Sequence, residues 1–166
     1  MIIQRATIDD AAEILALQKL AYLSEAELYG DFSIPPLTQT LEELMESYSR
    51  NTILKAVEEG RIIGSVNGRM SEGRCLVGRL MVHPARQRTG LGTALMAAIE
   101  KEFPQAQMYR LFTGERSERN IRLCERLGYR IYEGKEIQGS FGIVFMEKKE
   151  NRRKSGNNIL NSANDQ

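Results

Sequence analysis

At 166 residues, with 23 Lys and Arg against 22 Asp and Glu, the chain carries a formal net charge of +1. A chain of this length is expected to fold as one domain and to bury roughly 70% of the surface that its unfolded form exposes. The near-neutral balance argues against a nucleic-acid-binding protein and against an acidic tail, so any site for charged ligands has to be local.

The cysteine and histidine content argues against a metal centre. Cys75, Cys124 and the single histidine, His83, lie far apart in the sequence and do not make a recognisable zinc site, which requires three or four N or S ligands. The two cysteines, in a chain whose first residues do not resemble a signal peptide, indicate reduced thiols. Because no stretch approaches the ~18 apolar residues of a membrane span, we expect a cytoplasmic protein without metal or membrane partners.

The first 36 residues are predicted to contain a strand, a helix and a loop. Residues 2–6 form a short apolar run that fits a strand, and Thr7 with Asp10 resembles a helix N-cap followed by an acidic residue three positions on. Helical spacing of apolar residues then continues to Ala21. Residues 22–36 lose this periodicity, so a loop is predicted there.

A second helix and three consecutive strands follow. The helix begins at a capping box formed by Thr40 and Glu43, and its apolar positions continue to Tyr48. Apolar strand patterns separated by short Gly-containing turns cover residues 52–58, 61–70 and 74–82. Three strands joined by tight turns predict an antiparallel meander.

The last third alternates helices and strands. A helix is predicted from Leu91 to Phe103, where Pro104 ends it. The remaining elements are a strand at 108–113, a helix at 117–127 ended by Gly128, and strands at 129–133 and 141–148. Residues 1–149 are therefore predicted to form one domain, and the polar, aperiodic residues 150–166 a disordered tail.

The segment ARQRTGLGTALM, residues 85–96, connects the third meander strand to a helix. The first amides of a helix lack partners within it and form an anion site, and Gly90 and Gly92 have no Cβ to keep a ligand away. Arg86 and Arg88 add positive charge. The spacing suits a pyrophosphate, although such a turn often serves only to reverse the chain.

Two nucleotide-binding motifs are excluded at this loop. A phosphate-binding loop of the NTPase type ends in Gly-Lys-Ser/Thr, but Thr93 and Ala94 follow Gly92 here. A dinucleotide fingerprint needs a third small residue where Leu95 stands. The preceding strand also belongs to a hairpin series, and it does not open a βαβ unit.

The longer segment LMVHPARQRTGLGTALM resembles the acetyl-CoA motif of the GNAT superfamily of N-acetyltransferases. The helix SERNIRLCERLGYR resembles the second motif of that family, and the order of elements agrees over residues 2–148. The resemblance implies a three-layer α/β (α+β) fold, with a mixed, mostly antiparallel sheet of about seven strands flanked by four helices.

The resemblance also implies which residues hold acetyl-CoA. The strand before the loop is splayed from its neighbour in such proteins, and its backbone pairs with the pantetheine arm while the loop amides hold the pyrophosphate. Ser117 takes the place of a common Asn and is also a natural N-cap, and Asn120 lies one turn later. The implied cosubstrate-binding residues are Leu80, Met81, Val82, Arg88, Thr89, Gly90, Leu91, Gly92, Thr93, Ser117 and Asn120.

The reaction that the resemblance implies is direct acetyl transfer from acetyl-CoA to a primary amine. A backbone amide near Val82 would stabilise the oxyanion, and a side chain would protonate the leaving thiolate. Many family members use a Tyr for this proton four residues before the Gly of Leu-Gly-aromatic, but Cys124 stands at that position here. Cys124 is thus the candidate acid, and its competing interpretation is a small core residue. Water or one of the tyrosines Tyr22, Tyr29 and Tyr109 remain alternatives.

The acceptor is less determined than the donor. Residues 22–36 commonly border the acceptor cleft in this family, and Glu25, Glu27 and Asp31 among nearby aromatics would suit a cationic amine of a small molecule or a peptide. The same residues also fit a solvated loop. Glu72 and Glu115 are candidate bases, with surface solvation as the simpler interpretation.

Two other functions stay open at this stage. A catalytically silent CoA-binding sensor with the same fold is consistent with the replaced tyrosine. A protein-interaction domain fits poorly with an intact loop. Dimers are frequent among similar proteins, which leaves a homodimer open.

Overall fold

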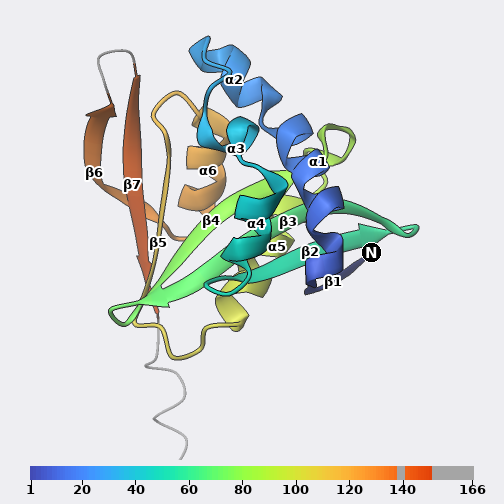
Figure 1. The fold of residues 1–166 in the computed structure, drawn as a ribbon. Helices are drawn as coiled ribbons and strands as arrows, with labels where there is room; N and C mark the ends of the chain where they lie inside the picture. Colours follow the sequence, from blue (N-terminus) through green and yellow to red (C-terminus); the bar gives the residue numbers. More distant parts are fainter. Residues whose placement is uncertain (138–140, 151–166) are drawn as a thin grey trace, which may run out of the picture.

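The computed structural model describes residues 1–137 and 141–150, and these form a seven-stranded sheet with helices on both faces (Figure 1). Most of the predicted tail, from residue 151 on, lies outside the described residues. The strands are β1 (Ile2–Arg5), β2 (Thr52–Glu58), β3 (Arg61–Ser71), β4 (Arg74–Val82), β5 (Met108–Gly114), β6 (Arg130–Ile137) and β7 (Phe141–Lys149). The helices are α1 (Ala11–Ala21), α2 (Leu23–Tyr29), α3 (Pro35–Thr38), α4 (Leu41–Ser47), α5 (Leu91–Lys101) and α6 (Glu118–Arg126).

The sheet is mixed and mostly antiparallel, as the sequence predicts. Its spatial order is β1-β2-β3-β4-β5-β7-β6, and only the central β4–β5 pair is parallel. The pairing of β4 with β5 covers three residue pairs, from Arg74↔Met108 to Leu76↔Arg110, and the strands then separate. The remainder of β4 therefore has no strand partner on the β5 side.

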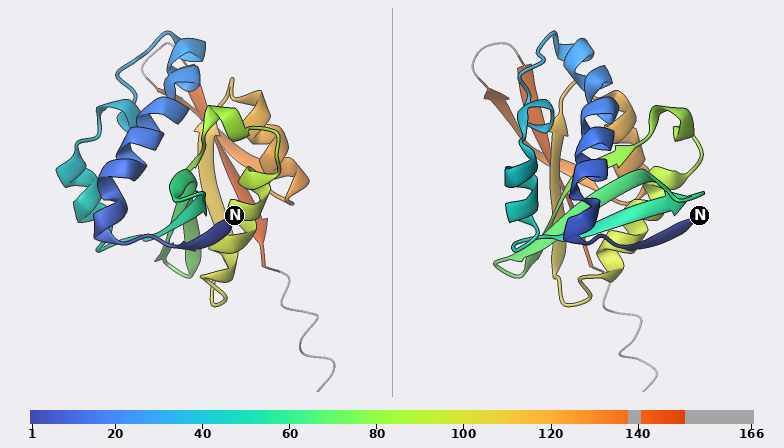
Figure 2. Two further views of the ribbon diagram at one scale, coloured as in Figure 1. Left: turned by 90° about the vertical axis from the view of Figure 1, so that its right-hand side faces the viewer. Right: turned by 45° about the vertical axis from the view of Figure 1, so that its right-hand side comes forward.

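Two hydrophobic cores, one on each face of the sheet, make the fold three-layered (Figure 2). The cores follow from the alternation of side chains along a strand. In β2, Ile53 packs with α1 and α4, whereas its neighbour Leu54 packs with α5 on the other face. In β3, Ile62 and Ile63 divide between the two cores in the same way.

The prediction of a loop at residues 22–36 is wrong, because α2 and α3 occupy much of it. An isolated seven-residue helix is unstable in water, so its formation depends on tertiary packing, here the complete burial of Ala26. Gly30, with a φ of +62°, ends α2, and Pro35 begins α3. The described residues thus contain six α-helices, against the four that were predicted.

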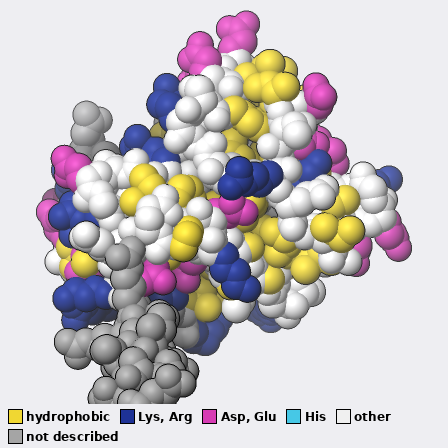
Figure 3. Space-filling view, turned by 90° about the horizontal axis from the view of Figure 1, so that it is seen from below, with side chains coloured by type: hydrophobic (Ala, Val, Ile, Leu, Met, Phe, Trp, Pro, Cys, Tyr) yellow, Lys and Arg dark blue, Asp and Glu magenta, His cyan; other side chains and the backbone are white. Residues whose placement is uncertain are grey.

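The outer surface agrees with the charge balance of the chain. On the face seen from below, Lys and Arg side chains are interspersed with Asp and Glu (Figure 3). Buried ion pairs are also rare among the described residues. One partly buried example joins Lys55 of β2 to Asp10, with 2.8 Å between Nζ and Oδ2.

We expect Gly68→Ala to destabilise the domain by about 1–3 kcal/mol, because a Cβ there overpacks the core beneath α5. The added atom would lie 2.8 Å from Cε2 of Phe103 and 3.0 Å from Cγ1 of Ile99. The free energy of unfolding in urea measures the effect. Gly134→Ala is the control, since its nearest contact would be an ordinary 3.9 Å. Equal midpoints for the two variants would contradict the packing described for β3 and α5.

Candidate acetyl-CoA site

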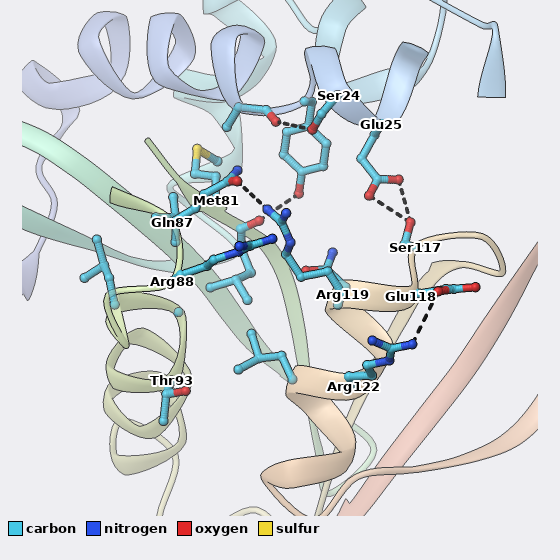
Figure 4. A pocket seen from close by; sticks show the side chains of 18 of the residues that line it. Ser24, Glu25, Met81, Gln87, Arg88, Thr93, Ser117, Glu118, Arg119 and Arg122 are labelled. Atoms are coloured by element: carbon cyan, nitrogen blue, oxygen red, sulfur yellow. Dashed lines mark hydrogen bonds and ion pairs between the residues drawn. The ribbon is translucent and has the colours of Figure 1, made fainter. Parts of the chain in front are cut away.

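A cavity of about 1140 Å³ opens where β4 leaves β5, between the end of α1, α2 and the N-termini of α5 and α6 (Figure 4). It brings together nearly all residues that the sequence associates with acetyl-CoA. Those on its wall are Leu80, Met81, Val82, Arg88, Gly90, Leu91, Gly92, Thr93, Ser117 and Asn120. Thr89 lies instead at a smaller neighbouring hollow with Arg86, whose backbone carbonyl accepts a hydrogen bond from the Thr89 hydroxyl at 2.5 Å.

A β-bulge marks the point where β4 faces the cavity. Ser65 pairs with Met81 and Asn67 pairs with Gly78, so two β4 residues, Arg79 and Leu80, lie opposite a single residue of β3. Arg79 has a φ of +51°, which is uncommon for a residue other than glycine. Bulges of this kind bend a strand and redirect its backbone groups. Here the bulge lies beyond the last β4–β5 pair.

The loop before α5 ends in an uncapped helix N-terminus. Gly90 occupies the N-cap position with a φ of +84°, and no side chain caps the helix. The first backbone bond within the helix runs from the Ala94 amide to the Gly90 carbonyl, which leaves the amides of residues 91–93 without helical partners. Such amides attract anions, and the helix dipole adds to the attraction.

The two loop glycines have different roles. Gly90 provides the left-handed backbone and has open space around it. A Cβ on Gly92, in contrast, would lie 3.2 Å from Cδ2 of Leu123, so this glycine allows α5 to approach α6. Open space at Gly90 is thus consistent with a loop that a ligand could approach, whereas the missing Cβ at Gly92 serves the packing of α5 on α6.

Arginines of α6 form a basic stripe along the cavity that the sequence reading missed. Arg119, Arg122 and Arg126 recur at helical spacing, and all three line the wall. This spacing is visible in the sequence but also fits an ordinary solvated helix face. Arg119 bonds Gln87 across the cavity, and Arg122 lies 3.5 Å from Glu118 (Figure 4). Together with Arg88 they give this half of the cavity a positive character.

Arg86, which the sequence offered beside Arg88 as a source of positive charge, lines the cavity but is paired with Glu58. Its Nε lies 2.7 Å from Oε2 of Glu58, and this hydrogen bond holds the pKa of the Glu58 carboxyl below its usual range. Arg88 carries no such partner among the described contacts and adopts a φ of +65°. Arg88 is thus the better candidate for a phosphate contact.

Ser117 was predicted to cap α6, and the structure corrects that role. Its side chain makes no cap and instead lies 2.8 and 2.6 Å from the two carboxylate oxygens of Glu25 on α2 (Figure 4). Ser117 is buried, with 4% of its surface exposed. A hydroxyl donates only one proton, so this bond orients Glu25 at the cavity wall and leaves carboxylate lone pairs free.

The region predicted to border the acceptor contributes four residues to the cavity wall, Tyr22, Ser24, Glu25 and Leu28. Glu27 is exposed outside the cavity, and Asp31 accepts a hydrogen bond from the Ser33 amide. The Tyr22 hydroxyl donates to the Leu80 carbonyl at 3.1 Å. Burial raises the pKa of Tyr22 to about 12, so the phenol is protonated at neutral pH.

The two candidate bases are placed differently. Glu115 lines the cavity, and its Oε1 accepts a hydrogen bond from the Gly142 amide at 3.0 Å. Glu72 lies in the β3–β4 turn, 3.9 Å from Arg74, and is not among the described residues of the wall. His83 has no role assigned from the sequence, and its Nδ1 accepts a hydrogen bond from the Ala85 amide at 3.0 Å.

Cys124 lies in the hydrophobic core with 3% of its surface exposed, and it is not among the described residues that line the cavity. Its α6 neighbour Leu123 faces the cavity in its place. Burial raises the pKa of the thiol to about 11. The placement favours the packing role of Cys124 over its predicted role as the acid.

The match to known proteins decides the family. The family model described as "Acetyltransferase (GNAT) family" matches residues 17–129, which include β4, the loop, α5 and α6. The chain belongs to this family. No helix in the described part of this GNAT domain combines the length and the apolar character needed to cross a bilayer.

A curated relative is similar over most of the chain. The GNAT domain is 30% identical over 136 residues to the UPF0157 protein YqkA of Bacillus subtilis, a match that covers 81% of this chain and 39% of that protein. The chain thus spans well under half the length of this curated relative.

Two solved structures share the fold. The PaiA N-acetyltransferase of Thermoplasma acidophilum, in complex with coenzyme A, has a TM-score of 0.73 at 18% identity over 90% of this chain and 100% of that one. The ribosomal-protein-S18-alanine N-acetyltransferase of Escherichia coli has a TM-score of 0.74 at 15% identity over 89% and 92%.

We expect the Cys124 thiol to react slowly with a disulfide reagent such as DTNB at pH 8, because a thiolate is the reacting form and burial disfavours it. Both cysteines are buried, and the pKa of Cys75 is also raised, to about 12. Absorbance at 412 nm follows the reaction, and the same protein in urea is the control in which both thiols react. Rapid release of one equivalent from the native Cys75→Ala variant would place Cys124 in contact with solvent.

Proposed function

We propose that this GNAT domain transfers an acetyl group directly from acetyl-CoA to a primary amine of a small molecule or peptide. One observation carries the proposal: an uncapped α5 N-terminus, a basic α6 stripe and an unpaired β4 edge converge on one cavity. These three features complement the anionic phosphates and the amide-containing arm of CoA.

The cavity divides into a donor half and an acceptor half. The amides at residues 91–93 would hold the pyrophosphate, with Arg88 and the α6 arginines contributing charge. The backbone of Leu80 to Val82 would pair with the pantetheine arm, which places the thioester toward α1 and α2. A backbone amide of this strand would stabilise the oxyanion that forms when the amine attacks the thioester carbonyl.

The acceptor half favours a cationic amine. Glu25 is a carboxylate oriented by Ser117 toward the cavity, and Glu115 lies on the same wall. An aliphatic amine has a reference pKa near ~10.4, so it arrives as a cation that a carboxylate attracts and must lose a proton before it attacks. We propose that Glu25 binds this cation and accepts its proton.

A catalytically silent acetyl-CoA sensor is the competing function. The observation that favours it is the burial of Cys124, since the position usually taken by the acidic tyrosine then presents no polar group to the cavity. The two functions agree on acetyl-CoA binding and differ only in turnover.

Acetyl-CoA at a hundred times its Kd should stabilise the domain by about 2.7 kcal/mol, which raises Tm by roughly 5–10 °C. Arg126→Gln should weaken this binding about tenfold, since Arg126 lines the cavity, and Arg130→Gln outside the cavity is its control. Thiol release from acetyl-CoA across a panel of amines then separates enzyme from sensor. The absence of a Tm shift at millimolar acetyl-CoA would contradict both the enzyme and the sensor function.

Glu25→Gln should selectively impair transfer to amines with an additional positive charge. Gln retains an oxygen for the Ser117 hydroxyl but removes the negative charge from the wall. We expect kcat/KM for an aliphatic diamine to fall about tenfold relative to that for an amino acid of similar length. Glu27→Gln, exposed on the same helix, is the matched control. An unchanged ratio would remove Glu25 from the acceptor site.

A further inference from the structure

Of the six tyrosines in the chain, all of which are described, Tyr22 is the one whose side chain lines the cavity. The Tyr29 hydroxyl accepts a hydrogen bond from the backbone amide of Arg116 at 2.8 Å. The Tyr109 hydroxyl lies 3.1 Å from the Glu100 carbonyl, in the core beneath α5. Tyr48 packs against the core between α1 and α4. The Tyr129 hydroxyl donates to Glu100, and the ring of Tyr132 lies under the guanidinium of Arg110.

Tyr22 is held against the unpaired part of β4. It directly follows α1, and its hydroxyl donates to the Leu80 carbonyl at 3.1 Å. Leu80 belongs to the β-bulge and lies four residues beyond the last β4 residue that pairs with β5. The only phenol of the cavity is therefore fixed to the same strand edge on which the cosubstrate arm would run.

We propose that the Tyr22 hydroxyl donates a hydrogen bond to the sulfur of CoA as it leaves, the task for which position 124 carries no tyrosine. The inference rests on the proposed function, because it assigns one step of the same acetyl transfer.

The step balances without a further reactant. The amine nitrogen forms a bond to the thioester carbonyl carbon, and the C–S bond then breaks with its electron pair remaining on sulfur. The proton lost by the amine passes to a carboxylate or to water. When an amide of the pantetheine arm donates to the Leu80 carbonyl, it replaces the Tyr22 hydroxyl there and frees its O–H for the sulfur.

The ionisation of Tyr22 fits hydrogen bonding better than complete proton transfer. Burial is the main cause of the raised pKa of Tyr22, which is about 12. The positive charge of Arg79 lowers this pKa, and the negative charge of Glu25 raises it. A thiol has a reference pKa of about 8.5, so a proton would not move spontaneously from this phenol to the thiolate. The phenol therefore stabilises the developing negative charge, and the thiolate takes its final proton from water.

The test compares wild-type protein, Tyr22→Phe and the control Tyr132→Phe, which removes a phenol on β6 that does not line the cavity. Thiol release is measured with saturating acetyl-CoA and hydroxylamine, so that the natural acceptor need not be known. Tyr22→Phe should lower kcat about 10- to 100-fold, the range expected for a hydrogen bond to a charged group. Its Kd for CoA should stay within about threefold of wild type.

A series of fluorotyrosines at position 22 separates an effect on catalysis from a loss of activity through misfolding. These analogues keep the ring and the donor but make the phenol progressively more acidic, so kcat should vary with phenol pKa while Tm stays constant. A Tyr that only supports β4 would give a flat series.

The outcomes separate this inference from the function on which it depends. Equal kcat for wild type and Tyr22→Phe, or a flat fluorotyrosine series, would overturn the role of Tyr22 and leave the acetyltransferase intact. A wild-type protein that binds acetyl-CoA yet releases no thiol would overturn both.

Discussion

The early divergence of β4 from β5 is the constraint on which the rest of the site depends. The two parallel strands share three residue pairs and then separate, which leaves the rest of β4 without a strand partner on the β5 side. Unpaired backbone groups inside a protein are costly unless another partner replaces the missing strand. In this structure Tyr22 satisfies one of them, the Leu80 carbonyl, and the remaining edge faces a cavity wide enough for an extended ligand.

The helices around the divergence supply complementary charges. The N-termini of α5 and α6 both point into the cavity, and α6 adds its row of arginines. On the opposite wall, α2 presents Glu25. The cavity is thus basic where phosphates would bind and acidic where an amine would enter. Such a separation of charge favours a ligand that is anionic at one end and a second substrate that is cationic.

Hydrogen bonds between distant segments hold Tyr22 and α2 in place at the cavity wall. Glu25 reaches Ser117 across 92 residues of sequence, and Tyr22 reaches Leu80 across 58. Both begin in or beside α2, a helix too short to be stable without its neighbours. The wall formed by Tyr22 and α2 therefore depends on the packing of the domain, whereas the unpartnered amides before α5 belong to one continuous loop and helix start.

The sequence by itself determined the order of most elements along the chain, the loop between β4 and α5 and the family resemblance, because these depend on local periodicity and on residues adjacent in the chain. The alternation in β2 and β3 and the Thr40 capping box are of this kind. Only the tertiary structure decided that residues 22–36 are largely helical, that Ser117 orients Glu25, and that Tyr22 faces the cavity while Cys124 faces the core. The physical reason is that a helix position alone does not specify which neighbouring layer its side chain meets, and hydrogen bonds between remote segments have no local signature.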